Sequence, residues 1–89
     1  MDKSDIAAQT RRYITDNFLY TRPNLRLGDD DRLLEKGIID SMGVMELVTF
    51  LQEQFTIAVD ESEITEDHFG SISAIAAFVA EKRAGSRAA

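Results

Sequence analysis

The sequence predicts an all-α fold, a small four-helix bundle with a long first loop and a short third helix. Its 89 residues, 44% of them hydrophobic, suffice for one modest core. Apolar residues recur at the three-and-four spacing of helices, and no segment alternates for long enough to indicate a strand. We therefore expect residues 1–89 to form a single domain.

The first helix is expected over residues 4–20, where Ile6, Ile14 and Phe18 lie four or eight residues apart. Pro23 disfavours helical geometry at the residue before it, so the helix should stop shortly before this proline. Glycines and three aspartates occur in the long connection that follows, but apolar residues punctuate it. We expect this loop to pack on the core, and loops of such length in small domains are often functional.

The second helix is expected over residues 41–54, and at 100° per residue it has two faces. One face is an apolar stripe for the core, made of Val44, Leu47, Val48, Leu51 and Phe55. The opposite face carries Met42, Met45, Glu46, Thr49 and Glu53. Isolated exposed apolar residues are normal, but methionine is unbranched and polarizable and suits surfaces that accept several partners. We interpret this second face as a partner-binding surface.

Two shorter patterns complete the chain. A short third helix is expected over residues 63–69, anchored by its apolar residues. A fourth helix is expected over residues 71–84, with Ser71 as its N-cap and Gly85 as its stop signal. Residues 85–89 should form a mobile tail, because they offer little to pack.

Charge is segregated along the chain. Residues 37–81 hold nine acids and no lysine or arginine, and the whole chain has a net charge of -6. Such a field should repel nucleic acid and anionic lipid, whereas a basic protein surface is its natural complement. Glu66 and Asp67 belong to this acidic stretch, so we assign them to the partner-binding surface together with the acids of the second helix.

Composition excludes several other classes. No apolar run approaches the length of a membrane span, so we expect no membrane insertion. The N-terminus resembles neither a signal peptide nor a transit peptide, and the chain has no cysteine, which favours the cytoplasm. With His68 as the only imidazole, we expect no metal site.

Residues 37–48, GIIDSMGVMELV, place Asp40 and Ser41 at the start of the second helix. Both residue types cap helices, so the pair could be a cap in an unmodified acidic adaptor, or Ser41 could accept a phosphate there. An enzyme would instead use Ser41 as nucleophile with His68 as base. That alternative lacks a Gly-x-Ser-x-Gly elbow, and a domain of this size leaves little room for a substrate pocket.

The same residues carry a family resemblance. Asp40-Ser41-Met42, followed by Glu46-Leu47, resembles the D-S-[LM]-x-x-x-E-L motif of acyl carrier proteins, and the likeness extends over nearly the whole chain. The resemblance implies that a phosphopantetheinyl transferase attaches 4′-phosphopantetheine from coenzyme A to Ser41. The thiol of this arm would carry acyl groups as thioesters. It also implies that Asp40 lies where the transferase and its metal ion approach.

The arm would be attached through a phosphodiester, an anion that is favoured at the positive end of a helix. Fatty-acid-synthesis carriers usually read Gly-Ala-Asp-Ser-Leu-Asp, whereas this chain has no acid at Gly43. The runs GIIDSMG and TEDHFGSI are more similar to D-alanyl carriers and to other free-standing aminoacyl or peptidyl carriers. We therefore favour a specialised carrier over a general fatty-acid carrier. The resemblance further implies a monomer without catalytic activity, served by a loading ligase and by acyltransferases with basic docking surfaces.

Overall fold

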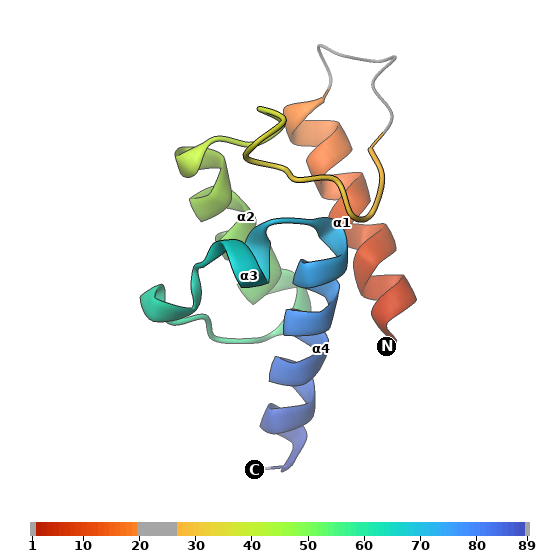
Figure 1. Cartoon of the computed structure of the whole chain (residues 1–89). Coiled ribbons are helices and arrows are strands. Elements are labelled where there is room, and N and C mark those ends of the chain that lie inside the picture. Colours follow the sequence, from red (N-terminus) through yellow and green to blue (C-terminus); the bar gives the residue numbers. More distant parts are fainter. Residues whose placement is uncertain (1, 20–26, 89) are drawn as a thin grey trace.

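A computed structural model describes residues 2–19 and 27–88, with side chains through residue 85. Within these ranges the chain forms four α-helices and one 3-10 turn, and no strand occurs in them, which confirms the predicted all-α class. The elements are α1 (Lys3–Phe18), α2 (Ser41–Phe55), the turn η1 (Glu61–Glu63), α3 (Glu66–Phe69) and α4 (Ile72–Ala88). The helices α1 and α4 form the most extensive pair, and α2 packs against both (Figure 1).

The core lies where the apolar stripes of the three long helices meet. The apolar side chains with 0% exposure come from α1 (Ile6, Ile14), α2 (Leu47, Leu51, Phe55) and α4 (Ile72, Ile75, Val79). The predicted stripe of α2 is confirmed, because all five of its residues are buried. The release of water from these apolar surfaces is the main force that holds the helices together.

The structure tests the expected start of the first helix but not its expected end. The helix begins at Lys3, one residue earlier than expected, because Asp2 is its N-cap and accepts a hydrogen bond from the Asp5 N–H at 3.0 Å. Its last helical residue is Phe18. Tyr20 and Pro23, which set the expected end, lie outside the described residues.

The prediction of one short helix over residues 63–69 is wrong. Residues Glu61–Glu63 form the separate turn η1, and α3 covers only Glu66–Phe69. The interruption lies at Thr65, whose backbone is extended and whose carbonyl accepts a hydrogen bond from the Phe69 N–H at 2.8 Å. A side-chain contact closes the turn, since the Asp60 N–H donates to Glu63 Oε1 at 2.9 Å.

Ser71 caps the fourth helix as predicted, because its Oγ accepts a hydrogen bond from the Ala74 N–H at 3.1 Å. The predicted stop at Gly85 is wrong, because α4 continues through Ala88. Residue 89, the last of the predicted mobile tail, lies outside the described residues. A glycine inside a helix costs only about 1 kcal/mol relative to alanine, which neighbouring helix formers can offset.

The described part of the first loop packs on the core, as expected. Leu27, Leu33 and Ile38 are buried, whereas Leu34 is 39% exposed. Two backbone hydrogen bonds tie the loop to the α3–α4 corner: the Leu33 N–H donates to the Gly70 carbonyl, and the Ser73 N–H donates to the Asp29 carbonyl, each at 2.9 Å. The loop therefore delivers the chain to the start of α2 from a fixed position.

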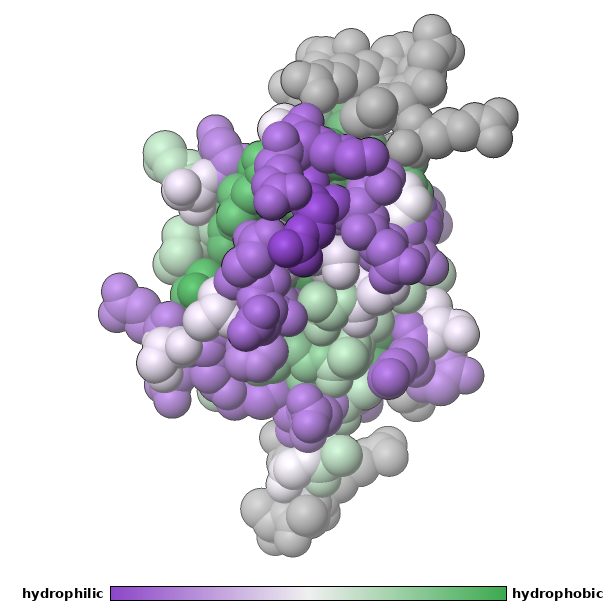
Figure 2. Space-filling model, in the orientation of Figure 1, coloured by the Kyte–Doolittle hydropathy of each residue, from purple (hydrophilic) through white to green (hydrophobic). Residues whose placement is uncertain are grey.

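The surface is mostly polar, with an apolar area near the start of α2 (Figure 2). Among the described residues, the large apolar side chains that are exposed are Leu34, Met42 and Met45. None of the described helices is long and apolar enough to cross a membrane.

Candidate functional site

Ser41 is the first residue of α2, and its side chain is exposed. The preceding Asp40 caps the helix, because its Oδ1 accepts a hydrogen bond from the Gly43 N–H at 2.8 Å. The Ser41 hydroxyl makes no hydrogen bond to any residue that the structure describes. Asp40 therefore caps this helix, and the Ser41 hydroxyl is left exposed and takes no part in capping.

A tight turn holds Asp40 in place. Gly37 has φ +69°, a left-handed conformation that glycine adopts without strain. The N–H groups of Ile38 and Ile39 both donate to the Leu33 carbonyl, at 2.9 and 3.2 Å, and both side chains are buried. The two isoleucines thus anchor the chain immediately before the exposed Asp40-Ser41 pair.

Gly43 has a packing reason to be glycine. A Cβ at this position would lie 2.7 Å from Ile39 Cγ2 and 2.9 Å from Phe18 Cε1, both closer than real Cβ contacts. The missing acid that distinguishes this motif from the fatty-acid pattern therefore corresponds to a place with no room for a side chain. Glycine lets the end of α1 approach the first turn of α2.

The electrostatics of the helix start favour an anion on the Ser41 oxygen. The N–H groups of the first helical turn lack partners within the helix, and the helix dipole places partial positive charge at this end. The first turn of α2 contains no acid, and Asp40 directs its Oδ1 to the Gly43 N–H. These groups fit a phosphodiester attached through the serine oxygen.

The residues of the predicted partner surface are all exposed, but they lie on two helices, α2 and α3. All five residues assigned on α2 are exposed, with Met42 at 79% and Met45 at 54%. Glu66 and Asp67 are exposed as well, but they lie on α3, and Glu66 Oε1 is 3.6 Å from Arg32 Nε. Arg32 thus partly compensates the charge of Glu66.

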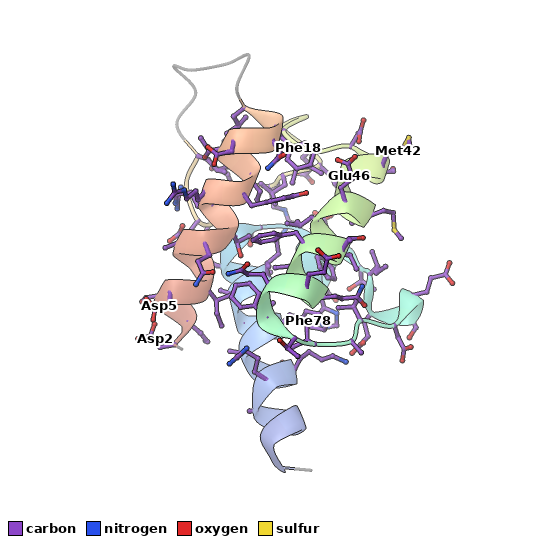
Figure 3. The ribbon with its side chains drawn as sticks, turned by 180° about the vertical axis from the view of Figure 1, so that it is seen from behind. Asp2, Asp5, Phe18, Met42, Glu46 and Phe78 are labelled. Atoms are coloured by element: carbon purple, nitrogen blue, oxygen red, sulfur yellow. The ribbon has the colours of Figure 1, made fainter. Side chains whose placement is uncertain are left out.

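A hollow beside Ser41 was not anticipated from the sequence. It measures about 370 Å³, and its lining includes Asp40 and Met42, the two sequence neighbours of Ser41. The rest of the lining comes from Phe18, Gly37, Ile38, Gly43 and Glu46. Figure 3 shows Phe18, Met42 and Glu46 at the same end of the molecule. The sequence pattern indicates only that Phe18 and Ile38 are core residues. The one sequence feature that could have indicated a close approach of α1 to the start of α2 is Gly43, which has no side chain.

A second hollow of about 380 Å³ follows along the contact of α1 with α2. Its aromatic wall is formed by Tyr13 and Phe50, whose rings stack with centroids 4.1 Å apart. The Tyr13 hydroxyl donates a hydrogen bond to the Glu46 carbonyl at 3.4 Å. Burial, and secondarily the Glu46 carboxylate, raise the pKa of Tyr13, so this hydroxyl stays protonated at neutral pH.

His68 is not arranged as a base for Ser41. Its Nδ1 lies 2.8 Å from the Glu63 carbonyl oxygen, and its ring stacks on Phe78 with centroids 4.6 Å apart. In the part of the chain that the structure describes, Nδ1 of His68 contacts Glu63 and Thr65 and neither ring nitrogen makes a hydrogen bond to Ser41, so the nucleophile–base pair that an enzyme would need is not formed. Within the described residues, no cluster of three histidines or acids could hold a metal ion.

Comparisons with known proteins agree with this geometry. A family model described as "Phosphopantetheine attachment site" matches residues 18–79. The D-alanyl carrier protein of Streptococcus sanguinis (strain SK36) is 32% identical over 79 residues, which cover 89% of this chain and 96% of that protein. The D-alanyl carrier protein of Streptococcus gordonii is 37% identical over 54 residues, 61% of this chain and 68% of that protein. That of Streptococcus mutans is 29% identical over 79 residues.

These relatives confirm the resemblance to D-alanyl carriers that the GIIDSMG run indicated. Proteins of this kind carry 4′-phosphopantetheine covalently and interact with phosphopantetheinyl transferases and loading ligases. Since the family model matches well over half of the chain, this protein belongs to the phosphopantetheine attachment site family and is a carrier protein whose cofactor is covalent 4′-phosphopantetheine.

Proposed function

We propose that Ser41 bears the arm and that the protein carries an aminoacyl group on it as a thioester. The observation that carries this proposal is the exposed Ser41 hydroxyl at the start of α2, which leaves capping to Asp40. It lies inside the region matched by the family model. We further propose that residues 1–89 act as one carrier domain, as a monomer in the cytoplasm.

Attachment requires one phosphoryl transfer. The Ser41 oxygen forms a bond to the phosphorus of the pantetheine phosphate while the pyrophosphate bond of coenzyme A breaks, and adenosine 3′,5′-bisphosphate leaves. The hydroxyl proton goes to a base of the transferase, since no hydrogen bond joins His68 to Ser41 within the described residues. This chain contributes an exposed nucleophile and a helix start that stabilises the product anion.

The cargo we propose is a small amino acid, with D-alanine as the first candidate, in a specialised pathway. The support is that similar proteins over most of this chain are named D-alanyl carriers. Large side chains from α2 and α4, such as Phe55 and Ile75, fill the centre of the bundle with no exposure. A short polar cargo needs no interior space and can be presented from the surface.

We propose that the protein is not an enzyme and that its exchange of partners uses the exposed face of α2. Met42 and Met45 supply an adaptable apolar contact there, and Glu46, Thr49 and Glu53 surround it with polar and acidic groups. Glu66 and Asp67 on α3 extend the acidic rim. Partners with basic docking surfaces would bind such a face quickly and weakly, as a shuttling carrier requires.

The test is the intact mass of the purified protein before and after incubation with coenzyme A, magnesium and a broad-specificity phosphopantetheinyl transferase. Wild type and Ser71→Ala should gain one phosphopantetheine mass, and Ser41→Ala should gain none. The holo protein should then accept D-alanine from a D-alanyl ligase in preference to L-alanine or a long-chain acyl group. A folded, initially unmodified wild type that gains no mass would make Asp40-Ser41 a cap in an acidic adaptor.

A further inference from the structure

We infer that the groove between α1 and α2 is the resting seat of the protein's own phosphopantetheine arm, with its dimethyl end beside Phe18 and its thiol beside the Tyr13–Phe50 stack. This inference rests on the proposed attachment at Ser41. It adds where the arm lies when no partner enzyme holds it.

The groove begins at the attachment site. The first hollow contacts Asp40 and Met42 on either side of Ser41, and Gly43 and Phe18, which pack closely against each other, both line it. An arm leaving the Ser41 oxygen therefore needs to turn only around the end of the helix to enter this hollow. Phe18 and Met42, visible at one end of the molecule in Figure 3, flank its entrance.

The three hollows adjoin one another along the contact of α1 with α2, because neighbouring hollows share lining residues. The first and second hollows share Glu46 in their linings. The second shares Tyr13, Asn17 and Phe50 with a third hollow of about 320 Å³, which extends to Gln54. The groove thus follows α2 from its first turn toward its C-terminal end.

The length of the arm matches the first two hollows. About 14 bonds join the serine oxygen to the thiol sulfur, and at the ~1.1–1.2 Å per bond of an extended chain the arm spans roughly 16 Å. At 1.5 Å per residue, α2 rises about 14 Å between Ser41 and Phe50 and about 20 Å between Ser41 and Gln54. A thiol tethered to Ser41 therefore reaches the Tyr13–Phe50 stack but not the far end of the groove.

The order of chemical groups along the groove matches their order along the arm. Nearest the phosphate, the arm has a geminal dimethyl group, and the first hollow offers the apolar side chains of Phe18, Ile38 and Met42. Two amides follow, and the second hollow offers hydrogen-bonding groups on Asn17, Thr49 and Glu46. At the end, a polarizable thiol would meet the aromatic wall, and sulfur–aromatic contacts are favourable.

The seat overlaps the proposed docking face, because Met42, Glu46, Thr49 and Glu53 line the hollows and also lie on the exposed side of α2. A partner that covers these residues would compete with the arm for them. Partner binding would then favour release of the arm into the partner's active site.

The test uses holo protein made from coenzyme A with a ¹³C-labelled pantetheine moiety, so that nuclear Overhauser effects (NOEs) from the arm are observed selectively. We expect NOEs from the geminal methyls to the Phe18 ring and from the terminal methylenes to the Tyr13 and Phe50 rings. We expect none to Gln54, which lies beyond reach. The amide signals of Asn17 and Thr49 should also shift between the apo and holo forms.

A matched pair of variants locates the effect. Phe50→Leu keeps an apolar side chain but removes the stacked ring, and it should abolish the contacts of the terminal methylenes while those of the geminal methyls persist. Phe78→Leu, which changes a ring packed on His68 and Phe69, should leave both sets unchanged. An arm that shows no NOEs to the protein, or shows them to Ile64 and His68 on the α3 side, overturns the seat. Failure of the arm to attach at all would instead overturn the proposed function.

Discussion

Two helices of this protein start beside a serine, and the two serines differ in what they do. Ser71 precedes α4, is nearly buried, and accepts the capping hydrogen bond from Ala74. Ser41 opens α2, is exposed, and leaves capping to Asp40. Both starts have the residue types that favour a cap, so the availability of a serine depends on whether its neighbour does the capping.

The first loop connects the two starts. Its Leu33 N–H donates to the Gly70 carbonyl just before Ser71, and its Leu33 carbonyl accepts the N–H groups of Ile38 and Ile39 just before Asp40. One loop residue therefore fixes a buried helix start on one side and an exposed one on the other. The exposed start is held by backbone hydrogen bonds and buried isoleucines, which keep Ser41 in position without enclosing it.

The largest effect on this comparison is expected at Gly43. Gly43→Ala places a Cβ within 3 Å of both Ile39 and Phe18, and Ile39 is buried and β-branched, so it yields poorly. Overpacking costs about 1–3 kcal/mol, and better helix propensity returns up to about 1 kcal/mol. We expect the free energy of unfolding to fall by about 1–2 kcal/mol, measured by urea denaturation.

Gly85→Ala is the matched control, because Gly85 lies in α4 with no atom within 4 Å of a Cβ. The same substitution there should raise the free energy of unfolding by up to about 1 kcal/mol. Equal effects at the two glycines would show that Phe18 does not press on the start of α2, where Phe18 and Gly43 both line the first hollow.

Sequence reasoning recovered what depends on local pattern. The faces of α2, the Ser71 cap and the place of Asp40-Ser41 at a helix start follow from spacing and residue type, and the structure bears out each of them. The break at Thr65 and the helical Gly85 were missed, because an interruption inside a short helix and a single glycine near a helix end are ambiguous local signals: one glycine costs a helix only about 1 kcal/mol. The groove was missed for another reason: periodicity shows that Phe50 lies on the Glu46 side of α2, but not that Tyr13 covers it.

A smaller effect is expected when each of the two serines is replaced by alanine, because the two substitutions should lower the free energy of unfolding by different amounts. Ser71→Ala removes a partly buried cap and should lower the free energy of unfolding by about 1 kcal/mol. Ser41→Ala removes an exposed hydroxyl without a described hydrogen bond and should change it by less than about 0.5 kcal/mol. Urea midpoints at constant slope measure both. A Ser41→Ala protein that loses as much as Ser71→Ala would mean that the Ser41 hydroxyl also supports its helix.

The smallest expected effect is on the pH dependence of stability, through the ion pair between Glu63 of η1 and Lys82 of α4. The Glu63 carboxylate accepts hydrogen bonds from the Asp60 N–H at 2.9 Å and from Lys82 Nζ at 2.9 and 3.1 Å. The backbone hydrogen bond first, and the lysine second, hold the pKa of Glu63 below its ordinary value of 4.5. Because the pKa is lower in the folded state, this carboxylate stabilises the fold above the ordinary value, and the stabilisation is lost as the pH falls through the folded pKa.

Glu63→Gln should therefore lower the urea midpoint slightly at neutral pH, and its difference from wild type should shrink as the solution is acidified below the ordinary carboxyl range. Glu61→Gln, in the same turn, is the control and should change the midpoint less at neutral pH, because no ion pair joins Glu61 to a described residue. Phosphopantetheine attachment should be equal in both variants, since Glu63 ties η1 to α4 and does not contact the start of α2. A Glu63→Gln protein with normal stability but slow attachment would contradict this assignment. The Glu63–Lys82 ion pair would then support modification of Ser41 rather than the packing of α4.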